Sequence, residues 1–89
     1  MSNATGEFKK GSKTDKVMNF LSNYPGVWFS SLTLTESMSD NLSHNTVRGL
    51  MVHLKKYECV VYKKGKLRDT VFTIDADSLA RYYSRLIIQ

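Results

Sequence analysis

The side chains best suited to recognition chemistry lie together in NLSHNTVRGLMVHLKKYE, residues 41–58. The polar first turn is followed by apolar residues at positions i, i+3, i+4 and i+7, where i is Val47. This spacing predicts an amphipathic helix with Ser43 as its N-cap. Asn pairs with adenine and Arg with guanine through two hydrogen bonds each, so this helix is suited to reading base edges. The alternative is an ordinary solvated helix start. The candidate recognition residues are Ser43, His44, Asn45, Thr46, Arg48 and Lys56.

Gly49 falls in the middle of the same predicted helix, where it costs about 1 kcal/mol relative to Ala. With the apolar residues turned toward a core, Asn45, Gly49, Val52 and Lys56 point away from it. Gly49 therefore either permits the close approach of a partner or packs tightly against another helix of the protein.

A second basic segment, KKGKLR, provides Lys63, Lys64, Lys66 and Arg68. Four positive charges on one loop are suited to phosphate contacts, and their alternative role is a solvated loop tip. Leu67 at the apex is unusual for pure solvation, and it either wedges against a partner or folds back onto the protein.

Catalytic and metal-binding patterns are missing from the sequence. The acidic residues form no pair suited to general acid–base chemistry, and no glycine-rich phosphate loop follows a strand. His44 and His53 are nine residues apart, and Cys59 is the single cysteine, expected to be a buried small hydrophobic residue. We therefore expect no enzyme, no metal and no cofactor.

The preceding segment predicts two further helices. The first begins at Ser12 or Thr14, carries Val17, Phe20, Leu21 and Tyr24 on one side, and ends before Pro25-Gly26. Residues 27–29 predict a short strand. Residues 32–39 predict a second helix with a capping box at Thr33 and Glu36, and with Leu34 and Met38 on its apolar edge.

The following segment changes its periodicity. Val60 and Tyr62 lie two residues apart, as do Phe72 and Ile74, which predicts a β-hairpin with a long basic tip. Helical spacing returns after Asp77, which is predicted to cap a fourth helix. Its apolar residues are Leu79, Tyr82, Tyr83, Leu86 and Ile87.

Eighty-nine residues with 42% hydrophobic side chains indicate one small globular domain. The net charge of +5 favours a polyanionic partner, nucleic acid before membrane. No apolar run approaches the roughly 20 residues needed to cross a bilayer, and the polar start resembles no signal peptide. We expect residues 1–13 to form a flexible basic arm and the protein to be cytoplasmic.

The predicted order of helix, strand, helix, turn, helix, hairpin and helix, with SHNTVRGLMVHLKKYECVVYKKGKLRDTVFTID, resembles the winged helix-turn-helix superfamily. The resemblance implies an α+β, mostly helical fold in which a three-helix core carries a β-hairpin wing. Residues 14–75 would form this domain, and residues 76–89 would add a C-terminal helix.

The resemblance also implies sequence-specific binding of double-stranded DNA by a small transcriptional regulator of a microbe or virus. Residues 43–57 would enter the major groove and residues 59–75 would contact the backbone. Surplus apolar residues of the C-terminal helix either close the core or form a homodimer. The competing function is a winged-helix protein-interaction module without DNA readout. Binding of RNA or single strands is less favoured, because the aromatic residues occupy core-spaced positions.

Overall fold

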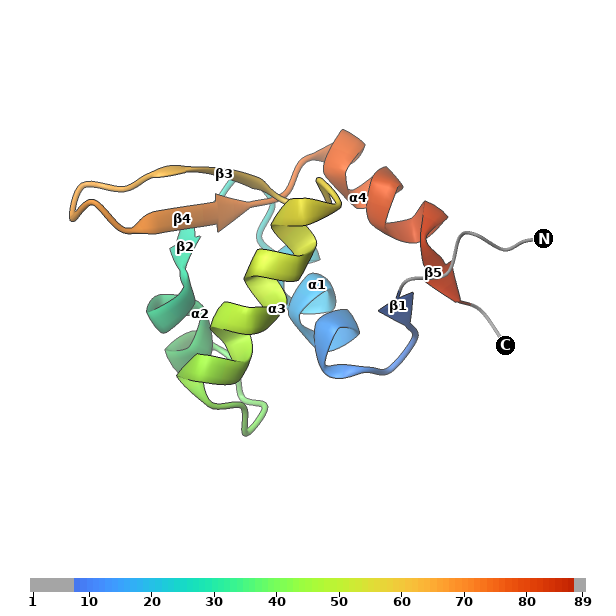
Figure 1. Ribbon diagram of the computed structural model, residues 1–89, viewed down its shortest axis with the longest axis horizontal. Helices are drawn as coiled ribbons and strands as arrows, with labels where there is room; N and C mark the ends of the chain where they lie inside the picture. Colours follow the sequence, from blue (N-terminus) through green and yellow to red (C-terminus); the bar gives the residue numbers. More distant parts are fainter. Residues whose placement is uncertain (1–7, 88–89) are drawn as a thin grey trace.

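The computed structural model describes residues 8–87, which form an α+β fold of helices around a small antiparallel sheet (Figure 1). Within this range, no helix combines the length and the apolar character needed to span a bilayer. The elements in chain order are β1 (Phe8–Lys9), α1 (Lys13–Ser22), β2 (Phe29–Ser30), α2 (Ser31–Ser37), α3 (His44–Lys56), β3 (Val61–Lys64), β4 (Thr70–Thr73), α4 (Ala76–Ser84) and β5 (Leu86–Ile87).

Helix α1 confirms the first predicted helix and its cap. The Ser12 hydroxyl accepts a hydrogen bond from the backbone N–H of Asp15, which leaves one fewer unpaired donor in the first turn. Val17 and Leu21 are buried together with Met18. Tyr24, which the spacing assigned to the same stripe, lies beyond the end of the helix and is half exposed.

The boundaries of the next two elements differ from the prediction. Strand β2 covers Phe29–Ser30 rather than residues 27–29, and it runs directly into α2. The Ser30 hydroxyl accepts the N–H of Thr33, so Ser30 caps α2, and the capping box predicted at Thr33 and Glu36 is wrong. The apolar edge of the helix is confirmed, since Leu34 and Met38 are both buried.

Helix α3 begins after Ser43, whose hydroxyl accepts the N–H of Thr46, so the predicted N-cap is confirmed. Residues 38–43 form the link between α2 and α3. At the other end of α3, Glu58 adopts a left-handed conformation with φ of 59°, and the N–H of Cys59 donates to Leu54 O. This is a Schellman motif, in which a left-handed residue satisfies the last helix carbonyls and turns the chain toward β3.

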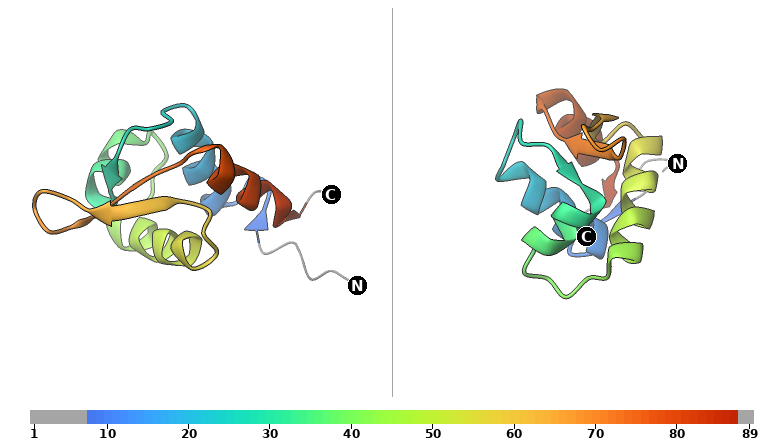
Figure 2. Two further views of the ribbon diagram at one scale, coloured as in Figure 1. Left: turned by 90° about the horizontal axis from the view of Figure 1, so that it is seen from above. Right: turned by 90° about the vertical axis from the view of Figure 1, so that its left-hand side faces the viewer.

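Strands β3 and β4 form the predicted hairpin, and β2 adds a third antiparallel strand in the order β2-β4-β3. Tyr62 pairs with Phe72 across the hairpin, so their side chains share one face. Phe72 is buried, whereas Tyr62 is half exposed because it lies on the edge strand. Figure 2 shows the hairpin extending away from the helices.

The C-terminal segment corrects two predictions. Asp75, not Asp77, caps α4, where hydrogen bonding from the backbone N–H of Ser78 holds the pKa of Asp75 below its usual range. The helix ends at Ser84 rather than continuing to the chain end, and residues 86–87 form strand β5. Strand pairing with β1 replaces the last helical turn that the apolar spacing predicted.

The prediction of a flexible basic arm over residues 1–13 is also corrected in part. Residues 1–7 lie outside the described range, but Phe8–Lys9 form β1, which pairs in parallel with β5. Phe8 is only 3% exposed, and its ring contacts the rings of His53, Tyr57 and Tyr82. Burial of this aromatic ring and the strand pairing hold the segment against the protein.

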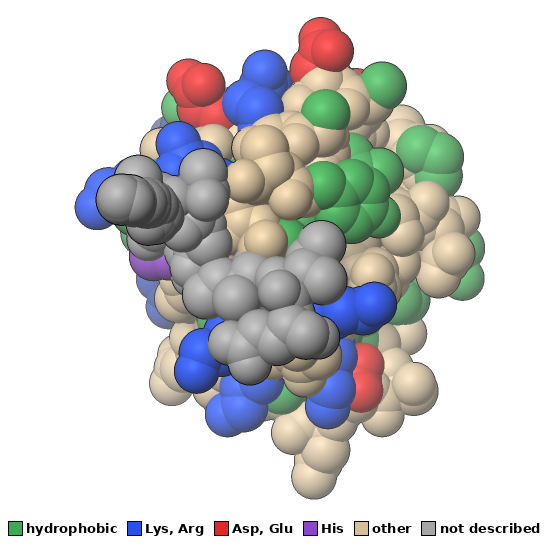
Figure 3. Space-filling view, turned by 90° about the vertical axis from the view of Figure 1, so that its right-hand side faces the viewer, with side chains coloured by type: hydrophobic (Ala, Val, Ile, Leu, Met, Phe, Trp, Pro, Cys, Tyr) green, Lys and Arg blue, Asp and Glu red, His purple; other side chains and the backbone are tan. Residues whose placement is uncertain are grey.

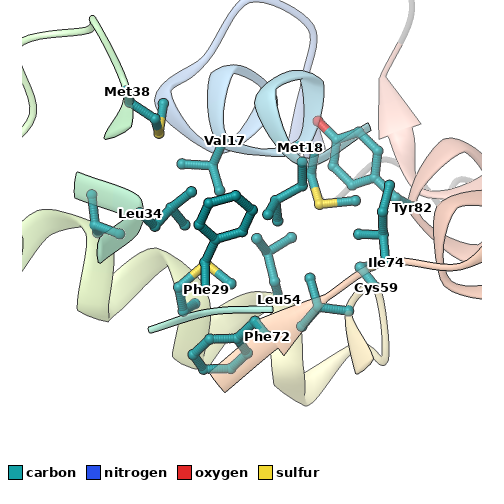
Figure 4. Close-up of a cluster of buried hydrophobic side chains, with 14 of the residues drawn as sticks. Val17, Met18, Phe29, Leu34, Met38, Leu54, Cys59, Phe72, Ile74 and Tyr82 are labelled. Carbon is teal, nitrogen blue, oxygen red and sulfur yellow. The ribbon is translucent and has the colours of Figure 1, made fainter. Parts of the chain in front are cut away.

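The hydrophobic core lies where the helices meet the sheet. Figure 4 shows side chains of the helices and of the sheet turned toward one another, among them Val17 from α1, Leu54 from α3 and Phe72 from β4. Cys59 belongs to this cluster with no exposed surface, which confirms the expected buried role, and burial raises the pKa of its thiol.

Candidate nucleic-acid interface

An open groove of about 680 Å³ lies between α3, the start of α2 and the hairpin tip. From α3 it is lined by His44, Arg48, Val52 and Lys55. The start of α2 contributes residues 30–33, and the hairpin contributes residues 67–70 together with Phe72. Residues 8–87 therefore leave the groove side of α3 uncovered, and the hairpin lies beside it (Figure 1).

The side of α3 that faces the groove is a stripe at helical spacing. His44, Arg48, Val52 and Lys55 follow one another at intervals of four, four and three residues, so they lie above one another on the helix. His44 and Arg48 were predicted as site residues and lie in the groove as exposed side chains.

Lys55 is a groove residue that the sequence analysis missed. Its ammonium group lies 4.5 Å from the centre of the Tyr62 ring, so a cation–π contact joins α3 to β3. The signal that could have found it is its position seven residues after Arg48, on the same helical side. The predicted residue Lys56 lies over the Tyr57 ring instead and does not line the groove.

The outermost line of α3 carries Asn45, Gly49 and Lys56, all exposed as predicted. A Cβ atom added to Gly49 would meet no atom within 4 Å. The alternative in which Gly49 packs tightly against another helix is therefore wrong. Folding alone gives no reason for a glycine at this position, where it costs about 1 kcal/mol relative to Ala.

Ser43 and Thr46 hold the start of α3 rather than offering free hydroxyl groups. The Ser43 hydroxyl accepts the Thr46 N–H at 3.1 Å and donates to Thr46 Oγ1 at 2.9 Å. Thr46 is also partly buried. Of the predicted residues in this turn, His44 and Asn45 are the exposed side chains left for a partner, and Ser43 and Thr46 fix the helix end that presents them.

The hairpin tip is a three-residue loop, shorter than the long tip that was predicted. The N–H of Gly65 donates to Asp69 O, and the N–H of Arg68 donates to Gly65 O at 3.1 Å. Arg68 has φ of 64°, the left-handed position that such loops usually give to glycine. A Cβ atom on Gly65 would lie 2.7 Å from the Asp69 carboxylate and 3.0 Å from a methyl carbon of Val71, so a larger residue here would require these side chains to shift.

Leu67 stands at the apex of this loop with 87% of its surface exposed. The alternative in which Leu67 folds back onto the protein is therefore wrong. The next two residues, Arg68 and the acidic Asp69, line the groove together with Leu67.

The lysines of β3 divide between the two faces of the hairpin. Lys63 is turned to the face opposite Tyr62, and its ammonium group lies 4.2 Å from the centre of the Trp28 ring. Lys64 shares the face of Tyr62, on the side of α3, and Lys66 is exposed in the loop. The structure therefore brings Arg68 into the groove, leaves Lys64 and Lys66 beside it, and places Lys63 on the other face.

Basic side chains also gather at the end of the molecule that carries the chain termini (Figure 3). Strand β1 and the turn after it lie at this end and provide the exposed Lys9 and Lys10 (Figure 1). These lysines are distant from the hairpin tip along the long axis of the molecule. They provide charge-matched controls for the groove.

The buried polar groups lie away from the groove. The Tyr82 hydroxyl donates to Asp15 Oδ1 at 2.7 Å, and Asp15 Oδ2 accepts the N–H of Gly11 at 2.7 Å. Burial and then the Asp15 carboxylate raise the pKa of Tyr82. Residues 8–87 contain no group of three or more His, Cys, Asp or Glu side chains arranged to hold a metal ion.

Comparisons of the chain with protein-family models, curated proteins and solved structures found no match. The functional assignment therefore depends on the groove and on the elements that form it.

Proposed function

We propose that the chain is a winged helix-turn-helix protein that binds double-stranded DNA in a sequence-specific manner. In this proposal α3 enters the major groove and the β3–β4 hairpin is the wing that contacts the backbone. The observation that carries it is the open groove between α3 and the hairpin, with Arg48 and Lys55 on one wall and Arg68 on the other.

The dimensions and charges of these elements support this arrangement. The major groove of B-DNA is about 12 Å wide and admits one helix. Val47, Met51 and Leu54 form the buried side of α3, whereas Asn45, Arg48, Gly49 and Val52 are exposed. Cations on two walls would meet phosphates on both sides of the inserted helix. The exposed Asn45 and Arg48 would then be available for base edges.

The test begins with selection of bound fragments from random duplex DNA at a stated salt concentration. Arg48→Ala is expected to weaken binding to the selected site by about 1–3 kcal/mol, while circular dichroism shows an unchanged fold. Lys10→Ala also removes one positive charge, but from the other end of the molecule, and it should leave the affinity close to that of the wild type.

Salt dependence gives a second measure of the same proposal. With about four phosphates neutralised by Lys55, Lys64, Lys66 and Arg68, log affinity should fall against log salt with a slope of about −3 to −4. Affinity that does not change with salt would contradict the proposed phosphate contacts.

One observation favours a protein-interaction module instead. Leu32, Val52 and Leu67 lie around the groove with 50%, 68% and 87% of their surfaces exposed, an apolar content suited to a protein partner. This alternative predicts that wild-type protein shifts no duplex at low salt, whereas the DNA-binding proposal predicts a shift that Arg48→Ala reduces.

A homodimer through α4 belongs to the same proposal, because two copies could span half-sites about 34–36 Å apart. Tyr83 supports it, since this residue of α4 is 52% exposed. Sedimentation at high micromolar concentration should detect the dimer, and a monomer under these conditions would contradict it.

A further inference from the structure

Two features of α3 are not explained by packing within residues 8–87. Val52 is an apolar side chain with 68% of its surface exposed on the groove side of the helix. Gly49 precedes it by three residues and has no neighbouring atom within 4 Å of an added Cβ. Both features leave an apolar area with little side-chain relief on the exposed surface of the helix, next to Arg48 and between Asn45 and the basic Lys55 and Lys56.

The geometry of a helix brings these two positions together. Side chains on a helix lean toward its N-terminus, so Val52 leans toward the position of Gly49, one turn earlier on the same side. The missing Cβ of Gly49 leaves a shallow notch there, open to solvent, and Val52 lies one turn further along the helix. Such a notch accepts a small apolar group and offers no hydrogen bond from a side chain.

We propose that Gly49 and Val52 form a contact for the C5-methyl group of thymine, so that the DNA site contains a T·A pair facing the middle of α3. This inference rests on the DNA-binding function proposed above. Thymine presents its methyl group in the major groove, where A·T and G·C pairs otherwise show hydrogen-bonding groups. The basic residues around the notch meet phosphates and guanine, whereas Val52 can recognise only an apolar group.

The test replaces each thymine of the selected duplex, one at a time, by deoxyuridine, which lacks only the methyl group. At one position the wild-type affinity should fall about fourfold, the loss expected when a single methyl group leaves an apolar contact. Val52→Ala should bind the unmodified site with a similarly reduced affinity and show no further loss with deoxyuridine at that position.

Leu32→Ala is the matched control, because Leu32 is another exposed apolar residue that lines the same groove. This variant should retain the wild-type response to deoxyuridine. Deoxyuridine without effect at every thymine, or a Val52→Ala variant that still responds to it, would overturn the inference while leaving DNA binding in place.

Gly49→Ala separates recognition from folding. Its melting temperature should rise by about 4–8 °C, since alanine favours the helix and meets no neighbour, while its affinity for the selected site should fall. Unchanged affinity of Gly49→Ala for the selected site would contradict a contact between the thymine methyl group and the notch at Gly49. If wild-type protein retains no duplex from the random pool, the proposed function fails, and the thymine contact fails with it.

Discussion

Tyr82 and Asp15 join segments from opposite ends of the chain through one hydrogen bond inside the core. The phenol donates to Asp15 Oδ1 at 2.7 Å, and neither residue is more than 5% exposed. A carboxylate oxygen at such a site needs a donor, because desolvation without a hydrogen bond is costly. This contact therefore joins α4 to the start of α1.

Tyr82→Phe should lower the free energy of unfolding by about 1–3 kcal/mol, because it leaves Asp15 Oδ1 buried without that donor. Urea unfolding followed by circular dichroism measures the change. Tyr83→Phe removes the neighbouring hydroxyl from a half-exposed ring and should have little effect. Equal stability of the two variants would contradict the structural role of the Tyr82 hydroxyl.

The hairpin is the element in which local backbone strain and the proposed function coincide. Arg68 occupies the left-handed position of the loop, at a cost of about 1–2 kcal/mol for a residue other than glycine. Glycine is the residue such a loop favours, so the arginine side chain needs another reason to be there. Its place in the groove supplies that reason if the hairpin contacts phosphate.

Arg68→Gly should keep or raise stability, by up to about 1 kcal/mol, because glycine adopts the same φ without strain. The same variant should bind the selected DNA more weakly and reduce the slope of log affinity against log salt by about 1. Arg68→Lys keeps both the charge and the strain, so it should retain the salt slope. A variant Arg68→Gly that binds as tightly as the wild type would show that this side chain makes no DNA contact.

At the scale of the whole molecule, the two ends of the described chain close the fold together. Strand β1 pairs with β5 in parallel. The Phe8 ring contacts His53 and Tyr57 at the end of α3 and also Tyr82 of α4. The N-terminal segment thus supports the C-terminal end of α3 through His53 and Tyr57, neither of which lines the groove.

Phe8→Ala should lower the free energy of unfolding by about 3–5 kcal/mol, the range found for removal of a buried aromatic ring. That loss is a large part of the roughly 5–15 kcal/mol total stability of a small domain. Urea unfolding would measure it, with Lys10→Ala as the control at an exposed neighbouring position. If Phe8→Ala unfolds at the urea concentration of the control, the segment is not part of the core.

Alkaline pH should destabilise the whole molecule. Burial raises the pKa of Tyr82 and of Cys59 in the folded state, so both keep their protons when the unfolded chain, with ordinary values of about 10 and 8.5, loses them. The unfolded state then binds fewer protons, and stability decreases as the pH rises above about 8.5. Urea unfolding at a series of pH values should show this decrease, and Tyr82→Phe should reduce it. Stability that stays constant over this range would contradict the raised values.

The sequence by itself determined the elements that depend on neighbours along the chain. The Ser43 cap, the α3 helix and the β3–β4 hairpin follow from side-chain hydrogen bonds to the nearest N–H groups and from apolar periodicity. These rules operate within a few residues, so the sequence predicted both the helix that carries Arg48 and the hairpin that carries Arg68.

Only the tertiary structure decided which residues meet across the fold. Apolar spacing could not distinguish Tyr82, which is buried on Asp15, from the half-exposed Tyr83, nor predict that β5 would pair with β1. In the same way, only the tertiary structure places Tyr62 of the hairpin against Lys55 of α3, which lines the groove. Such contacts join positions far apart in sequence, and their free energy depends on the burial and packing that arise when the elements come together.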